Sequence, residues 1–174
     1  MVHFSTSALA SIMITDLDLS LSEMGTIMGA WPMAYIILSI PVGLVLDRFG
    51  TRYLLLFGIA VMALSAYLRV SAESHGEMFF AVLIFGLGAP FISIGMPTLI
   101  REWFTYKQRG LALGICAVMI AVGSVSGLTV THELLSILDG SWRNVLKIYA
   151  IVCAVTACVW ALIINHPICK SNSK

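Results

Sequence analysis

Charged residues are what this sequence has least of. Only 11% of its 174 residues are Asp, Glu, Lys or Arg, and 59% are hydrophobic, whereas about a quarter of the residues in an ordinary soluble domain are charged. Two long stretches, residues 24–46 and 53–68, contain no charged residue. Each can cross or nearly cross a bilayer, because an α-helix rises about 1.5 Å per residue. The composition excludes an ordinary soluble protein, and no basic run suggests nucleic-acid binding.

Cysteine and catalytic groups are also scarce. The four cysteines form no C-x-x-C pair and have no histidine at metal-ligand spacing, so we expect small apolar residues of membrane helices. No charged residue stands at the centre of an apolar segment, which argues against a proton relay within the membrane. Gly123-Ser-Val-Ser-Gly127 only approaches a nucleophile elbow, because valine occupies the serine position. We therefore expect neither an enzyme nor a bound metal or cofactor.

Hydropathy and turn signals divide the chain into six apolar segments, at residues 2–15, 23–46, 52–70, 77–100, 109–131 and 145–165. They predict an all-α, polytopic membrane bundle over residues 1–168, ended by Pro167, and a cytoplasmic tail over 169–174. A membrane barrel would show shorter, alternating stretches. Ser20-Leu-Ser-Glu23 is a capping-box pattern at the start of the second segment. Gly25-x-x-x-Gly29 and Gly123-x-x-x-Gly127 predict close contacts between helices.

The first segment is anomalous. Its length of about 22 Å falls short of a hydrocarbon core about 30 Å thick. Either part of the first helix is missing from this sequence, or the helix lies shallow in the membrane.

The basic residues predict an orientation. If the turns after the second and fourth segments and the tail face the cytoplasm, that side holds seven of the ten Lys and Arg residues: Arg48, Arg52, Arg101, Lys107, Arg109, Lys170 and Lys174. The other side keeps Arg69, Arg143 and Lys147. This partition obeys the positive-inside rule. We therefore predict a multi-pass protein of the plasma membrane with both termini in the cytoplasm.

A charged motif lies between the second and third segments: Gly43-Leu-Val-Leu-Asp47-Arg48-Phe-Gly50-Thr-Arg52. It resembles the signature loop between the second and third helices of the major facilitator superfamily of transporters. The superfamily often has a basic residue where Thr51 stands, which is a mild departure. The resemblance implies that Gly43, Asp47, Arg48, Gly50 and Arg52 form a gating motif.

Two further segments carry the same resemblance. Arg101-Glu-Trp-Phe-Thr-Tyr-Lys-Gln-Arg109-Gly110 is similar to the cytoplasmic link between helices 4 and 5, in which Arg101, Arg109 and Gly110 are the matching residues. Ser141-Trp142-Arg143 resembles the pair that opens helix 6. The chain thus looks like the amino-terminal half of a twelve-helix transporter, six transmembrane helices arranged as a 3+3 inverted repeat. Within the superfamily it looks closest to the cyanate and nitroimidazole permease-like group.

The resemblance implies a role for Asp47. In the family this aspartate contacts helix 11 of the other half while the cytoplasmic side is closed, and breaking the contact permits opening. The alternative is that Asp47, Arg48 and Arg52 only anchor the helix ends. Two departures weaken a prediction of proton-driven export: Val82 stands where proton-coupled members often have an arginine, and Gly123-Ser124 replaces the antiporter Gly-Pro.

Polar and aromatic side chains within the segments are candidates for a substrate path. Trp31 and Tyr35 are four residues apart and share a helical face, where they either stack on a flat substrate or simply pack. Ser93 and Ser124 are the other candidates.

The sequence thus predicts transport of a small solute by alternating access, with the lipid bilayer, the solute and a second six-helix half or another copy of the chain as partners. The alternative is a non-transporting remnant, or a partner subunit of a split transporter.

Overall fold

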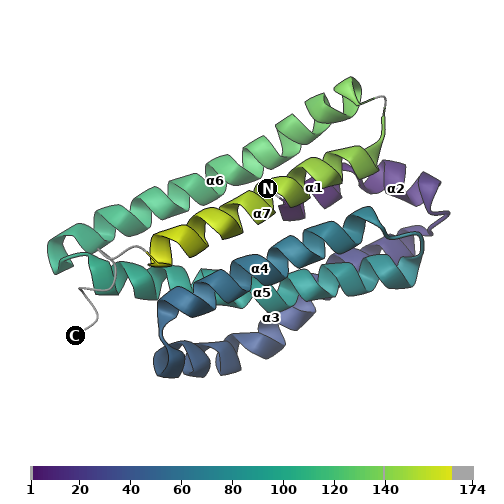
Figure 1. Cartoon of the computed structure of the whole chain (residues 1–174). Coiled ribbons are helices and arrows are strands. Elements are labelled where there is room, and N and C mark those ends of the chain that lie inside the picture. Colours follow the sequence, from purple (N-terminus) through teal and green to yellow (C-terminus); the bar gives the residue numbers. More distant parts are fainter. Residues whose placement is uncertain (1, 139, 166–174) are drawn as a thin grey trace.

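The computed structural model describes residues 2–138 and 140–165, and over this range the chain forms helices joined by short turns (Figure 1). The two amino-terminal helices are short, α1 (Val2–Ala8) and α2 (Ala10–Asp16). Five long helices follow: α3 (Leu21–Phe49), α4 (Thr51–Val70), α5 (His75–Trp103), α6 (Tyr106–Ile137) and α7 (Trp142–Asn165). This confirms an all-α fold. The predicted end of the bundle at Pro167 and the predicted tail lie outside the described residues.

Among the described residues, five helices, α3 to α7, are long and apolar enough to cross a membrane. The predicted count of six is not confirmed, because the first predicted segment is divided into α1 and α2 at Leu9. The interruption is local. The Leu9 amide still donates to the Ser5 carbonyl at 3.0 Å, and the Met13 amide donates to the Leu9 carbonyl at the same distance.

Local capping interactions set the start of α3. The Glu23 amide donates to the Ser20 hydroxyl at 3.2 Å, and the Glu23 carboxylate accepts from the Ser20 amide at 2.8 Å. The predicted capping box is therefore confirmed. The long helices extend a few residues beyond the apolar segments, because the ladder of backbone hydrogen bonds continues through polar residues at their ends.

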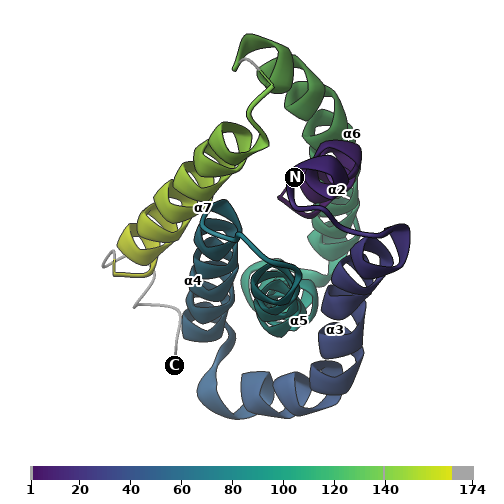
Figure 2. The same ribbon diagram turned by 90° about the vertical axis from the view of Figure 1, so that its right-hand side faces the viewer.

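Helix α5 is the centre of the bundle. It packs between α3 and α4, and α4 packs on its other side against α7 (Figure 2). The buried core includes Ile27, Met78, Val145 and Leu146, together with Leu9 from the amino-terminal pair. Helix α6 lies at the edge, where only Gly127 and Thr131 are buried. Most of its apolar surface is thus left for lipid or another protein.

Glycine permits the close packing of α5, but not at the predicted pairs. A Cβ built on Gly86 would lie 2.5 Å from the Trp31 carbonyl oxygen of α3, and one on Gly88 would lie 2.8 Å from the Gly58 carbonyl oxygen of α4. At Gly25, Gly29 and Gly123, by contrast, a Cβ would meet no described atom within 4 Å. The prediction of close contacts was wrong at these three glycines, because no other described helix approaches them, whereas Gly127, the second member of the other predicted pair, is buried.

Candidate functional site at the basic end of the bundle

The turns after α3 and α5 lie at the same end of the bundle (Figure 1). We call this the basic end and define it by five residues: Arg48, Arg52, Arg101, Lys107 and Arg109. Most of the motif that reads as a turn in the sequence is in fact helical, since α3 continues to Phe49 and α4 begins at Thr51. Gly50 alone makes the reversal. Its φ of +85° is a conformation that glycine adopts without strain.

Thr51 and Arg52 join the start of α4 to the last turn of α5. The Thr51 hydroxyl, which is buried, donates to the Glu102 carboxylate at 2.9 Å. The Arg52 guanidinium lies over the Trp103 ring, 5.3 Å from its centroid, at a distance typical of cation–π attraction. The Trp160 indole of α7 donates to the Arg52 carbonyl at 3.3 Å. One short segment thereby connects three helices.

Arg109 connects α5 to α6. Its Nη2 donates to the Arg101 carbonyl at 2.9 Å and its Nε to the Phe104 carbonyl at 3.2 Å. A guanidinium at the carboxyl end of a helix satisfies carbonyls that have no partner within the helix, and it also interacts favourably with the helix dipole. The structure thus brings the Arg109 side chain against the Arg101 backbone, while Gly110 lies exposed in the first turns of α6.

Asp47, unlike Thr51 and Arg52, makes no polar contact that joins it to another helix of the described chain. It is exposed in the last turn of α3, and its carboxylate forms no hydrogen bond or ion pair with the described residues. The nearby Arg48 guanidinium lies 5.9 Å from the Phe49 ring centroid, and Gly43 is helical, with no described atom within 4 Å of a Cβ built there. Asp47 is thus exposed on the last turn of α3.

Three of the four candidates for a substrate path lie together. The Trp31 and Tyr35 rings meet edge to face, with centroids 6.2 Å apart, and the Tyr35 hydroxyl lies 2.9 Å from the Ser93 hydroxyl of α5. Ser124 is not part of this group, since its hydroxyl donates to the Ile120 carbonyl of its own helix at 2.9 Å.

Sequence reasoning missed a buried cation. The partition of basic residues assigns Arg69 to the outer side of the membrane, but nothing in the sequence predicts that its side chain is fully buried, in contact with α1 and α5. Its Nη1 donates to the Thr6 hydroxyl at 2.8 Å, and its guanidinium lies 5.1 Å from the Phe85 ring centroid. The available signal was Ser65, which precedes Arg69 by four residues and so marks a polar face on an otherwise apolar helix.

A second missed contact lies at the opposite end. The Asp16 carboxylate accepts from the Trp142 indole at 2.8 Å and from Arg143 Nη1 at 2.7 Å. These bonds, the Trp142 hydrogen bond first, hold the pKa of Asp16 below its usual value. They tie the end of α2 to the start of α7.

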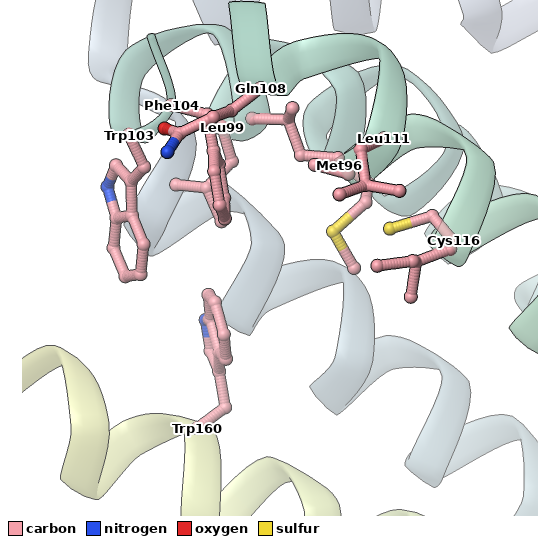
Figure 3. A pocket seen from close by; sticks show the side chains of 11 residues that line it. Met96, Leu99, Trp103, Phe104, Gln108, Leu111, Cys116 and Trp160 are labelled. Carbon is pink, nitrogen blue, oxygen red and sulfur yellow. The ribbon is translucent and has the colours of Figure 1, made fainter.

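Two apolar clefts lie beside α6. The first, of about 450 Å³, opens at the basic end between α5, α6 and α7, where the indoles of Trp103 and Trp160 face one another (Figure 3). The second, of about 630 Å³, continues between α4, α5 and α6 and is bordered by Ser93. Met96 and Cys116 line both clefts, so the two adjoin along α5 and α6, and we call them together the apolar channel.

Comparison with known proteins identifies the family. The family model described as Major Facilitator Superfamily matches residues 1–172. The chain is 27% identical over 168 residues to a probable L-galactonate transporter of Escherichia coli, a match that covers 93% of this chain and 36% of that protein. It is 30% identical over 119 residues to the probable anion transporter 3 of Arabidopsis thaliana, a chloroplastic protein (67% of this chain, 23% of that one).

An uncharacterized transporter of the same superfamily from Mycobacterium tuberculosis is 32% identical over 134 residues, covering 76% of this chain and 29% of that protein. The chain thus spans little more than a third of the length of these relatives at most. The family consists of secondary transporters and not of enzymes. With long apolar helices and a family model that matches residues 1–172, this chain belongs to the major facilitator superfamily.

Proposed function

We propose that the chain is the amino-terminal six-helix half of a secondary transporter that moves a small solute by alternating access. The observation that carries the proposal is the exposed Asp47 carboxylate at the end of α3, which has no partner among the described residues, whereas Thr51 and Arg52 of the same motif contact α5. A carboxylate at the edge of a membrane is most stable when it is paired. Its partner would belong to the opposing half, and breaking that contact would open the inner gate.

The α1–α2 pair fits the role of the first membrane-spanning helix. Leu9 and Met13 are fully buried in the shared core, and Ser5 and Thr6 are buried as well. The pair packs against α6 and α7, which are both candidate membrane spans. A segment packed against membrane-spanning helices lies within the membrane as they do, so we count α1 and α2 together as the sixth span. Six spans leave both termini on the same side, and we propose that this side is the cytoplasmic face of the plasma membrane.

The opposing half would cover the apolar faces of α3 and α6. Exposed residues on them include Ile36, Ile40, Ile120 and Val125. Membrane helices associate through close packing rather than through a hydrophobic driving force, so these faces can pack equally well against lipid or against another protein. The partner is therefore either a complementary half or a second copy of this chain, around a path between the two.

The names of the relatives suggest which solutes to test first. L-galactonate and the galactarate and D-glucarate of a 25% identical transporter are small organic anions, so we propose a small anion as the first substrate class. A relative is also named for acetylcholine transport, which makes a small cation the second class. None of these relatives is named for cyanate or nitroimidazole transport, so that placement stays a prediction.

The decisive experiment is uptake by the purified, reconstituted assembly. The chain is isolated with whatever polypeptide accompanies it, placed in liposomes, and offered radiolabelled L-galactonate, D-glucarate and acetylcholine in parallel. Uptake of one class by an assembly of two six-helix units supports the proposal. Uptake by a strictly monomeric chain would contradict the two-half arrangement. An intact assembly that moves none of the solutes, even under an imposed ion gradient, would favour the alternative of a non-transporting remnant or partner subunit.

A further inference from the structure

The cleft at the basic end combines two properties that membrane proteins use together. Its wall is almost entirely apolar, made by side chains such as Leu99, Leu111 and Ile115, and its mouth lies at the turn between α5 and α6. Arg101, Lys107 and Arg109 flank this turn, next to the lining residues Trp103, Phe104 and Gln108. Basic pockets between membrane helices are typical binding sites for anionic lipid headgroups.

We propose that this cleft binds an anionic phospholipid, with one acyl chain in the apolar channel and the phosphate at the basic mouth. The proposal concerns lipid binding alone and does not depend on which solute the protein moves.

The charges at the mouth favour a negatively charged headgroup. The basic end carries five Lys and Arg side chains, against the carboxylates of Asp47 and Glu102. Glu102 is already bonded to the Thr51 hydroxyl. Arg109 donates to two backbone carbonyls, and because a guanidinium has five N–H donors, it can also donate to a phosphate.

The aromatic side chains fit the same occupant. Trp103 and Trp160 face one another across the mouth (Figure 3), and tryptophan is enriched where a membrane protein meets the headgroup layer. The Gln108 side-chain carbonyl accepts from the Thr105 hydroxyl at 2.9 Å, which leaves its amide N–H groups to donate at the polar boundary. Deeper in, the cleft adjoins the second one at Met96 and Cys116, and the two together offer an acyl chain an apolar lining along α5 and α6.

The test uses the native tryptophans as reporters. The full chain, in a Trp31→Phe background, is reconstituted in phosphatidylcholine bilayers that contain brominated phosphatidylglycerol or brominated phosphatidylcholine, and the quenching of tryptophan fluorescence is measured. Trp142 is buried elsewhere and responds little. We expect phosphatidylglycerol to be preferred over phosphatidylcholine at least tenfold, since each nearby Lys or Arg strengthens the attraction about fivefold.

Two matched pairs of variants separate the contribution of the lipid headgroup from that of the acyl chain. Lys107→Gln should lower the preference about fivefold, whereas Lys147→Gln, an exposed lysine at the opposite end, should not change it. Ala112→Phe fills the cleft and should abolish the preferential quenching, while Ala121→Phe, on an exposed part of α6, should leave it intact. Circular dichroism confirms that each variant keeps its helical content.

Three results would overturn the proposal. Equal quenching by the two lipids would mean ordinary solvation by the bilayer. If the preference for phosphatidylglycerol remained in Ala112→Phe, the headgroup would bind at the protein surface and no acyl chain would occupy the cleft. Cross-linking of Cys116 between two copies of the chain would show that a protein helix, and not a lipid, occupies the channel.

Discussion

The Thr51 hydroxyl donates a hydrogen bond of 2.9 Å to the Glu102 carboxylate and so fixes the first residue of α4 to the last turn of α5. Thr51 stands where the superfamily often has a basic residue, so this chain joins the two helices through a neutral donor. The bond lies next to Gly50, the only residue between α3 and α4. It therefore fixes the start of α4 directly after the reversal that follows Asp47.

Loss of this bond should destabilise the fold. Thr51→Val keeps the shape of the side chain but removes the donor, and a hydrogen bond to a charged group contributes about 1.5–3 kcal/mol. We expect the free energy of unfolding to fall by that amount in a detergent titration. Thr129→Val is the control, because its exposed hydroxyl bonds only within α6. If the two variants had the same free energy of unfolding, the Thr51 hydrogen bond would not contribute to the stability of the fold.

The buried Arg69 predicts an unusual order of stabilities. Thr6→Val removes one acceptor from a buried guanidinium and should cost about 1.5–3 kcal/mol. Arg69→Met removes the charge itself and should cost less, because replacing a buried charge by an apolar side chain of similar volume is often neutral. Thermal unfolding of both variants in one detergent checks the order. An Arg69→Met protein less stable than Thr6→Val would contradict it.

Acid should loosen the contact between α2 and α7. The Trp142 indole, and then Arg143, lower the pKa of Asp16 from its usual value. The stabilising effect of this carboxylate is therefore fully present above about pH 4 and is lost as the pH falls through the lowered pKa. The difference in melting temperature between wild type and Asp16→Asn should be constant from pH 7 to about pH 5 and shrink below about pH 4. A difference that stays constant down to pH 2.5 would count against the contact.

Side-specific labelling should separate the two ends of the bundle. Single cysteines at Ser74 and Lys107, both exposed, are introduced into a chain whose native cysteines are replaced by serine. In intact cells a membrane-impermeant maleimide should label position 74 and leave position 107 unlabelled until the cells are permeabilised. Labelling of position 107 from outside would reverse the predicted orientation.

The sequence predicted the features that depend on neighbouring residues. The capping box joins Ser20 and Glu23, three positions apart. The motif located the reversal only within residues 47–51, and the structure narrows it to Gly50. The extension of the α3 and α4 helices into that motif was not predicted, since charged residues end an apolar run without ending a helix.

Contacts between distant residues could not be predicted in the same way. Asp16 and Arg143 are 127 positions apart, and Arg69 and Thr6 are 63 apart. Their partners depend on which helices become neighbours, which hydropathy does not reveal. The uniform hydropathy also hid the difference between α5, which is half buried, and α6, which is almost entirely exposed.

The substitution Asp47→Asn tests the central claim. Asparagine is nearly isosteric with aspartate, so expression and membrane insertion should be unchanged, but a charge-assisted contact worth about 1.5–3 kcal/mol would be lost. That loss shifts the ratio of closed to open states roughly ten- to a hundredfold. Asp18→Asn is the matched control at the opposite end, where the residue has a φ of +50° that asparagine tolerates.

The measurement is solute flux per inserted molecule in the complete two-half assembly. If Asp47 is the latch of the inner gate, flux falls at least several-fold in Asp47→Asn and stays at the wild-type level in Asp18→Asn. Wild-type flux in the Asp47→Asn protein would show that this aspartate only anchors the end of a helix, and the proposed gate would be wrong.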